Sequence, residues 1–298
     1  MEGIGLREDS KRYPRGNAAD FPQVEDERKG KEDELMVIRI RGLGQDQVRR
    51  EGHHHTTDWS QINWRRVHRK VQNLRFRIFR AAQPQDWDKV KELSRLMLKS
   101  YSNLLLSIRR VTQENTGHNT PGIDGKIITR DKERNQLADE LCKNAPWKAA
   151  PVRRLYIPKS NHKLRPLGIP TIANRAMQAV VKNVLEPRFE AEFEAQSYGF
   201  RPGRSCHDAI EEIHTALNEG ACGKNQYLLD ADIKGAFDHI NHEFILNRIG
   251  NTPEQALVKQ WLTAGYIEWG KFHQTTEGTP QGGVATPPTM LQNALCRA

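Results

Sequence analysis

The chain has 298 residues, and its 46 Lys and Arg outnumber its 37 Asp and Glu to give a formal net charge of +9. Its length is sufficient for one large domain or two small ones, and its 37% of hydrophobic residues is typical of a largely globular protein. The polar N-terminus, the lack of a long apolar run and four cysteines without C-x-x-C spacing argue against a secreted protein, a membrane span, a zinc ribbon and a disulfide framework. We therefore expect a soluble, cytoplasmic protein that does not enter a membrane.

The charge is unevenly distributed along the chain. Residues 1–58 carry 11 basic and 13 acidic side chains, a net of −2, and their polar composition predicts a disordered leader. Residues 59–187 carry 26 basic and 10 acidic side chains, a net of +16, whereas residues 188–298 carry 9 and 14, a net of −5. A basic block followed by an acidic one predicts a polyanion-binding surface beside a site that uses carboxylates.

Two helices are expected after the leader. Apolar residues from Trp64 to Ile78 recur at alternating intervals of three and four, as they do on one face of a helix. A second helix is predicted to begin at Asp86 and to continue to Val111, and Thr120–Gly125 predicts a tight turn. The polar faces of the first helix carry several basic residues, among them Arg65, Arg66, Arg69 and Lys70.

The remaining residues alternate between strand and helix patterns. Arg153–Lys159 and Leu164–Pro170 predict the two strands of a hairpin, and the helix that follows is predicted to end at Pro187. The other predicted elements are a helix after the capping-box sequence at Ser205, a strand over Tyr227–Ile233 and a helix over Gln255–Ala264. This order of elements indicates an α+β fold.

Two aspartates interrupt the predicted strand over Tyr227–Ile233. Asp230 and Asp232 are two residues apart, so both project from the same face of a strand. Two buried carboxylates need cationic compensation, and a hard divalent ion such as Mg²⁺ takes carboxylate ligands. A strand that ends at a solvent-exposed polar turn explains the same pattern, so the pair alone leaves both interpretations open.

Two other segments combine residues that suit ligand binding. Gly278–Val284 contains glycines, a proline and Gln281, which suits close approach to a ligand but is also typical of an ordinary turn. The predicted hairpin presents Lys159, Lys163 and Arg165, which suits phosphate binding but is also typical of a nucleic-acid-binding surface without catalysis. Each segment alone is ambiguous.

Taken in order, these segments resemble the group II intron reverse transcriptase/maturase family. The resemblance extends from Trp59 to about Val284, and six motifs in the family's order argue against a chance match. The matching stretches are Arg109–Thr112 with Thr120–Gly125, Tyr156–Pro170, Asn174–Gln178, Ser197–Ser205, Leu229–Ile240 and Gly278–Val284.

The resemblance implies a right-hand polymerase. An N-terminal helical extension would occupy residues 59–140, and the fingers and a partial palm would occupy residues 141–298. Members of the family synthesise DNA on an RNA template with two Mg²⁺ ions. On this match Asp232 is the catalytic residue and a metal ligand, and the Ile233 carbonyl is an accessory ligand. Phe237 is the bulky residue that would exclude a 2′-hydroxyl and so favour deoxynucleotides.

The resemblance also implies contacts with nucleotides and RNA. Lys159 and Arg165 match the finger residues that bind the incoming deoxynucleoside triphosphate, and Gln281 and Gly282 match the nucleotide- and template-binding motif. The expected partners are group II intron RNA and an RNA template with a DNA primer. The basic residues expected to contact RNA are Arg65, Arg66, Arg69, Lys70, Arg109 and Arg110.

The sequence departs from the family pattern in three places. Asn161-His162 stands where the family usually has a glycine, and Ala285–Met290 differs from the usual continuation after Val284. The family's second metal-binding motif, an aromatic residue followed by Ala-Asp-Asp, does not occur in the 298 residues. We therefore expect a C-terminally truncated reverse transcriptase that is inactive alone. The alternatives are a non-catalytic splicing factor that binds intron RNA and a gene remnant.

Overall fold

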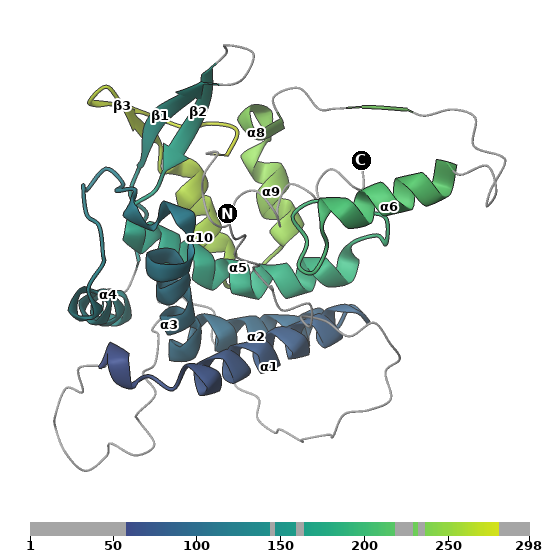
Figure 1. Ribbon diagram of the computed structural model, residues 1–298, viewed down its shortest axis with the longest axis horizontal. Coiled ribbons are helices and arrows are strands. Elements are labelled where there is room, and N and C mark those ends of the chain that lie inside the picture. The colour runs from purple at the N-terminus through teal and green to yellow at the C-terminus, as the bar shows by residue number, and fades with distance from the viewer. Residues whose placement is uncertain (1–57, 144–146, 159–163, 218–228, 232–235, 280–298) are drawn as a thin grey trace, which may run out of the picture. The chain divides into compact units, whose positions relative to one another are not determined.

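The structure is a computed structural model that describes residues 58–143, 147–158, 164–217, 229–231 and 236–279 (Figure 1). The chain divides into two compact units, one with Met1–Met36 and Gln196–Leu228 and the other with Val37–Ala195 and Leu229–Ala298. The predicted leader, apart from Asp58, and the turn of the predicted hairpin lie outside the described residues.

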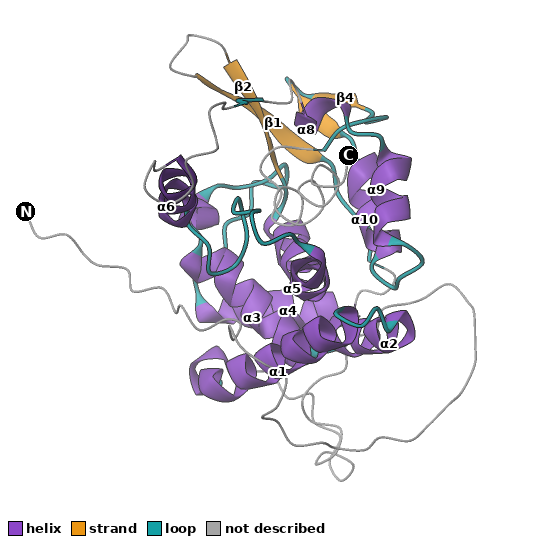
Figure 2. Cartoon of the chain, turned by 90° about the vertical axis from the view of Figure 1, so that its right-hand side faces the viewer, coloured by secondary structure: helices purple, strands orange, loops and turns teal. Residues whose placement is uncertain are grey.

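The described part of the larger unit begins with a helical layer in which α1 (Trp64–Ala82), α2 (Trp87–Leu98) and α3 (Tyr101–Arg109) pack on one central helix, α5 (Ile172–Glu192), and α4 (Asp131–Lys143) packs on α3. Figures 1 and 2 show α1 and α2 lying along α5, and α1, α2 and α3 all contact it. α1 buries Val67, Val71 and Ile78, which confirms the helical spacing of its apolar residues.

The helix predicted from Asp86 to Val111 is two helices, so this prediction is wrong in its length. Asp86 begins α2 as expected, with its carboxylate accepting a hydrogen bond from the first turn. Ser100 then caps α3, since its hydroxyl accepts a hydrogen bond from the Asn103 amide at 3.3 Å. A serine hydroxyl competes in this way with the helical backbone, which explains the break. α3 continues into a π-helical turn over Arg110–Glu114.

α5 runs through Pro187, so the prediction that this proline ends the helix is also wrong. The turn after Pro187 is anchored in the core. Phe189 is 1% exposed, and the Arg188 guanidinium donates a hydrogen bond to the Ile249 carbonyl at 2.6 Å. Such tertiary contacts compensate a mid-helix proline, which costs about 3 kcal/mol.

Four strands form one sheet in the larger unit. They are β1 (Val152–Pro158), β2 (Leu164–Ile169), β3 (Tyr266–Glu268) and β4 (Lys271–His273), in the order β2-β1-β3-β4. β1 and β2 form the predicted antiparallel hairpin, in which Arg154 lies opposite Gly168. β3 pairs in parallel with the start of β1, so the hairpin is extended by a segment from far along the chain.

In the described part of the larger unit, the chain continues with the helices α8 (Ala236–His239), α9 (His242–Ile249) and α10 (Gln255–Thr263). α10 confirms the predicted helix to within one residue. Ile245 and Ile249 of α9 belong to the same apolar core as the buried residues of α1 to α5. None of the helices in the described ranges combines the length and the apolar character needed to traverse a bilayer.

The smaller unit contains α6 (Cys206–Leu217). The capping box predicted at its start is confirmed. The Ser205 amide donates to an Asp208 carboxylate oxygen at 2.7 Å, and the Asp208 amide donates to the Ser205 hydroxyl at 3.3 Å.

A buried ion pair joins α5 to α1. Glu186 pairs with Arg75, and Glu186 Oε1 lies 3.5 Å from Lys182 Nζ. Arg75 also donates to Asn183 Oδ1 at 3.0 Å, and Asn183 donates to Asn103 Oδ1 of α3 at 2.7 Å. Burial alone raises the pKa of the Glu186 carboxyl, but the charges of Arg75 and Lys182 outweigh it and lower the pKa to about 2. Glu186 is therefore ionised at neutral pH.

Arg175 fixes the start of α5 to the predicted turn. Its buried guanidinium donates hydrogen bonds to three carbonyl oxygens, those of Gly117, Thr120 and Pro170. The backbones of the turn and of α5 also touch, because a Cβ added at Gly122 would lie 2.6 Å from Thr171 Cα. No residue larger than glycine fits there without a shift of the backbone. The turn therefore has a structural role in this fold.

We predict that Glu186→Gln lowers the free energy of unfolding at pH 7 by about 3–5 kcal/mol, because it leaves Arg75 and Lys182 buried without a countercharge. The measurement is urea unfolding of the 298-residue chain. The pKa of Glu186 falls from 4.5 to about 2 in the folded state, so its contribution is complete above pH 4.5 and is lost as the pH falls through about 2. The difference between variant and wild type should stay constant from pH 7 to about 5 and shrink in stronger acid.

The matched control is Glu92→Gln. Glu92 pairs with Lys89 at 3.5 Å, and the two side chains are 54% and 42% exposed. Surface pairs of this kind contribute less than about 1 kcal/mol. Equal effects of the two substitutions would contradict the importance of the buried pair.

Candidate active site

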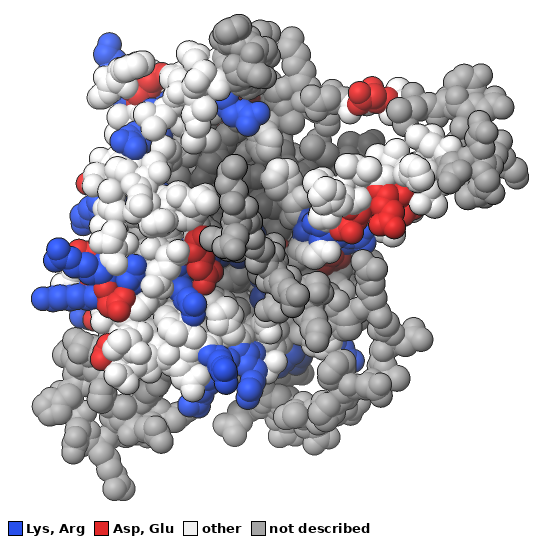
Figure 3. Space-filling view, in the orientation of Figure 1, with Lys and Arg blue, Asp and Glu red and all other residues white. Residues whose placement is uncertain are grey.

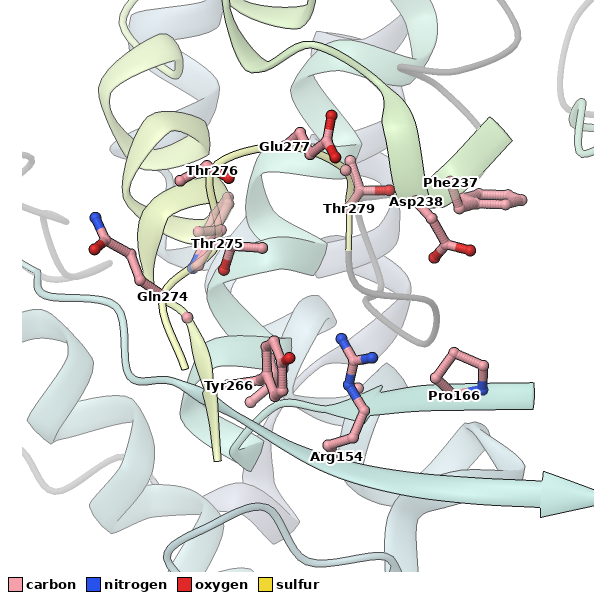
Figure 4. Close-up of a pocket in the computed structure, with 15 residues that line it drawn as sticks. Arg154, Pro166, Phe237, Asp238, Tyr266, Gln274, Thr275, Thr276, Glu277 and Thr279 are labelled. Carbon is pink, nitrogen blue, oxygen red and sulfur yellow. The ribbon is translucent and has the colours of Figure 1, made fainter. Parts of the chain in front are cut away.

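A cavity of about 400 Å³ lies between the hairpin, α8 and the segment after β4 (Figure 4). The hairpin side is lined by Val152, Arg154, Pro166 and Gly168. Phe237 and Asp238 of α8 and residues 274–279 form another wall. Three regions that are far apart in the sequence therefore meet here.

Arg154 is the basic side chain among the described residues that line the cavity. Its guanidinium lies 3.9 Å from the centroid of the Tyr266 ring, and that ring also stacks with the His273 imidazole at 4.9 Å. Figure 4 shows Arg154 pointing from β1 into the cavity beside Tyr266. A guanidinium held on an aromatic ring presents a fixed positive charge to a polar or anionic group.

Three hydrogen bonds, together called the tether below, join the segment after β4 to α8, to the residue after it and to the start of α9. The Gly278 amide donates to the Ile240 carbonyl at 2.8 Å, and the Thr279 amide donates to the Phe237 carbonyl at 2.7 Å. The Nε2 atom of His242 lies 2.8 Å from the Gly278 carbonyl oxygen. The position of Phe237 relative to the start of the Gly278–Val284 motif is thus fixed through the backbone.

Glycine is required at position 278 for two independent reasons, the backbone conformation and the lack of space for a side chain. Its φ of +74° lies in the left-handed region, which side chains disfavour. A Cβ there would also lie 2.5 Å from the Asp238 carbonyl oxygen. The adjacent Thr279 side chain is 5% exposed, and its hydroxyl has no hydrogen-bond partner in the described part of the chain.

The structure describes only some of the predicted site residues. The sites expected from the family resemblance that lie outside the described residues are Lys159, Asp232, Ile233, Gln281 and Gly282. Phe237 lines the cavity, and Figure 4 shows its ring directed away from Arg154. Arg165 is exposed on β2, next to the cavity-lining Pro166. Because successive residues of a strand face opposite sides of a sheet, Arg165 lies on the face opposite this cavity.

The predicted metal ligands are oxygen donors. A carboxylate from Asp232 and a carbonyl from Ile233 suit Mg²⁺, which prefers such ligands. In the ranges that the structure describes, no three His, Cys, Asp or Glu side chains are grouped as a metal site, and Asp230 is exposed. The family resemblance thus remains the basis for the expected metal site.

The basic residues predicted to contact RNA fall into two groups. Arg65, Arg66 and Arg69 are exposed on α1, and Lys70 is half-buried. Figure 3 shows Lys and Arg side chains gathered where Figure 1 draws α1. This exposed part of α1 can meet a polyanion without rearrangement.

The second group has partners within the protein. Arg109 Nε lies 3.1 Å from a Glu114 carboxylate oxygen, and its guanidinium lies 4.6 Å from the Trp64 ring centroid. Arg110 is half-buried, and its charge helps to lower the pKa of Glu186. Both arginines therefore also stabilise the helical layer.

Sequence patterns missed the tether. Arg154 belongs to the hairpin motif, but no spacing rule indicates that it stacks on Tyr266. His242 follows Asn241, the residue that caps α9, and its contact with Gly278 spans 36 residues. Such contacts depend on the tertiary fold, so no local sequence pattern predicts them.

Two reverse transcriptase families match the chain in the order of the architecture. The family described as the N-terminal domain of reverse transcriptase matches residues 59–141, and the family described as reverse transcriptase (RNA-dependent DNA polymerase) matches residues 157–295. Group II intron-encoded protein LtrA of Lactococcus lactis is 37% identical over 179 residues, which cover 58% of this chain and 29% of LtrA.

The chain belongs to the group II intron reverse transcriptase/maturase family. Protein YkfC of Escherichia coli is 35% identical over 209 residues, which cover 67% of this chain and 54% of YkfC. The chain thus spans about half or less of the length of these relatives. A chain of a partial Cas6-RT-Cas1–Cas2 complex aligns over 66% of this chain and 34% of its own length, at 21% identity and a TM-score of 0.41. The expected α+β fold, with a helical extension before the reverse transcriptase domain, is confirmed.

We predict that Gly278→Ala destabilises the tether, because the new Cβ collides with the Asp238 carbonyl and the residue must keep its left-handed conformation. The midpoint of thermal unfolding should fall, and the Thr279 amide should exchange faster with solvent. Gly270→Ala is the matched control, since Gly270 has a φ of +78° and open space around its Cβ position. The control should show only the conformational cost of about 1 kcal/mol. Equal losses in the two variants would contradict the role of the close contact.

Proposed function

We propose that this chain provides the fingers and part of the palm of a group II intron-encoded RNA-directed DNA polymerase and maturase, an enzyme that binds intron RNA and synthesises DNA on an RNA template. The observation that carries the proposal is the tether between Phe237 and the Gly278–Thr279 segment. It joins two segments that resemble separate polymerase motifs, in a chain whose residues 157–295 match the reverse transcriptase family.

The nucleotide site is proposed on residues from the fingers and palm. Asp232 and the Ile233 carbonyl are the proposed Mg²⁺ ligands. Mg²⁺, when bound, supplies charge neutralisation at the phosphates and activates a hydroxyl nucleophile. Lys159 and Arg165 are the proposed partners of the triphosphate of the incoming nucleotide, through charge-assisted hydrogen bonds. Arg165 would reach it from the face of β2 opposite the cavity that Phe237 lines. Gln281 and Gly282 contact the nucleotide and the template strand.

Phe237 is the proposed selector for deoxynucleotides. The Thr279 amide holds its carbonyl, so its backbone has little freedom to retreat from a ribose. A fixed ring excludes a 2′-hydroxyl by steric clash and so discriminates against ribonucleotides. A movable ring would discriminate poorly.

The proposed RNA-binding surface is the exposed basic part of α1. Arg65, Arg66 and Arg69 lie on this helix, with Lys70 half-buried beside them. The net charge of +16 over residues 59–187 favours a polyanionic partner in this part of the chain. The proposed partners are intron RNA and an RNA template with its DNA primer.

We predict that the double variant Arg65→Gln/Arg69→Gln weakens binding of intron RNA by the 298-residue chain on the order of tenfold at moderate salt. Two lost phosphate contacts should also reduce the slope of log affinity against log salt by about 1.5. Fluorescence anisotropy over a salt series measures both quantities.

The control is Lys259→Gln/Lys271→Gln, which removes the same charge from exposed positions on α10 and β4. Its effect should be small. If both double variants weaken binding equally, RNA is attracted by net charge alone and α1 is not the binding surface.

A second prediction concerns nucleotide selection. Phe237→Val should reduce the preference of the chain for Mg²⁺-dATP over Mg²⁺-ATP on the order of tenfold, because the smaller side chain leaves room for the 2′-hydroxyl. Competition binding with a fluorescent nucleotide measures the ratio. Phe244→Val, at a 48% exposed position on α9, is the control and should leave the ratio unchanged. A chain that binds RNA but no nucleotide would favour a non-catalytic RNA-binding role.

A further inference from the structure

His242 holds the one hydrogen bond of the tether that a side chain makes. The residue is half-buried at the first position of α9, and its Nε2 atom lies 2.8 Å from the Gly278 carbonyl oxygen. A carbonyl oxygen only accepts hydrogen bonds, so Nε2 must carry the proton. The contact therefore requires the Nε2–H form of the imidazole or the imidazolium.

Both polar groups of the Gly278–Thr279 peptide, its carbonyl oxygen and its amide, form hydrogen bonds. Its carbonyl oxygen accepts from His242, and its amide donates to the Phe237 carbonyl at 2.7 Å. Both groups belong to one planar trans unit, so they point in opposite directions and rotate together. A rotation that breaks one hydrogen bond breaks the other.

Because residue 278 is glycine, both hydrogen bonds are needed to hold the following peptide in one orientation. Gly278 has a φ of +74°, and glycine visits both positive and negative φ at little cost. The peptide after it is therefore free to flip unless its two polar groups are held. The Phe237 carbonyl holds the amide, and without His242 no partner in the described residues holds the carbonyl oxygen.

His242 is not needed to form α9. Asn241 caps the helix by accepting a hydrogen bond from the Phe244 amide at 3.1 Å. The buried residues of the helix are Ile245 and Ile249. Loss of the imidazole should therefore leave the helix and its packing in place.

We propose that His242 is a positioning residue that prevents the Gly278–Thr279 peptide from flipping and so fixes Phe237 against the segment that begins at Gly278. The consequence for deoxynucleotide selection rests on the proposed function of Phe237. The fixed peptide itself does not, since it follows from the hydrogen bonds.

Amide exchange in the 298-residue chain directly tests whether His242 holds the Gly278–Thr279 peptide in place. His242→Leu replaces the imidazole with an apolar side chain of similar size that cannot donate a hydrogen bond, and the Thr279 amide should exchange about fivefold to tenfold faster. His242→Gln supplies an N–H donor and should restore most of the protection. Glu243→Gln, at the exposed neighbouring position, is the control and should change nothing.

Two outcomes of the exchange experiment would overturn the proposal. One is unchanged protection of the Thr279 amide in His242→Leu. The other is an equal loss of protection throughout α9 and α10, which would make His242 a general structural residue. Nitrogen NMR of the wild-type chain gives an answer that needs no variant, because an Nδ1–H tautomer at His242 is incompatible with the hydrogen bond.

Nucleotide binding separates this proposal from the proposed function. His242→Leu should lower the preference for Mg²⁺-dATP over Mg²⁺-ATP severalfold, and His242→Gln should recover it. An unchanged preference in a variant whose Thr279 amide is deprotected would overturn the link to selection. A wild-type chain that binds neither nucleotide would overturn the proposed function. The exchange and tautomer results would still show whether His242 holds the Gly278–Thr279 peptide in place.

Discussion

The fold depends on the charged side chains that α5 buries. A charge removed from water is costly unless it is paired, so each of these side chains dictates the position of a neighbour. Glu186 requires Arg75 of α1, and the amide of Asn183 extends the same network to Asn103 of α3. Arg175 requires three carbonyl groups at the start of the helix. Apolar packing alone is tolerant of small rotations, whereas these pairs define one arrangement of helices around α5.

The same network joins the helical extension to the core of the region that matches the reverse transcriptase family. The family matches divide the chain near residues 141–157, but the apolar core does not divide there. Buried residues of α1 to α4 belong to one cluster with those of α5, α9 and α10. The basic surface of α1, the proposed RNA-binding surface, is thus built on the same core as the segment that is hydrogen-bonded to Phe237. Movement of one relative to the other would require the buried pair of Arg75 and Glu186 to separate.

Local patterns predicted the elements whose causes are local. The spacing of Val67, Val71 and Ile78 defines α1, and the Ser205 capping box defines the start of α6. Pro187 misled the prediction, because its cost is outweighed by contacts of the following turn that no local pattern reveals. For the site, the order of motifs indicated Phe237 and the Gly278 segment, but His242 and Arg154 act through partners on other elements. The role of a residue that acts through a long-range contact cannot be predicted from a single sequence.

α9 links the core to the site, because both of its ends are held. At its C-terminus the Ile249 carbonyl, which has no partner within the helix, accepts a hydrogen bond from Arg188 of α5 at 2.6 Å. At its N-terminus His242 meets the Gly278 carbonyl at 2.8 Å. Ile245 and Ile249 fix the helix sideways in the core. A rigid helix between two hydrogen bonds transmits the position of α5 to the peptide that confines Phe237. The proposed selection of deoxynucleotides by Phe237 therefore depends on a side chain of α5, Arg188, that lies outside the cavity itself.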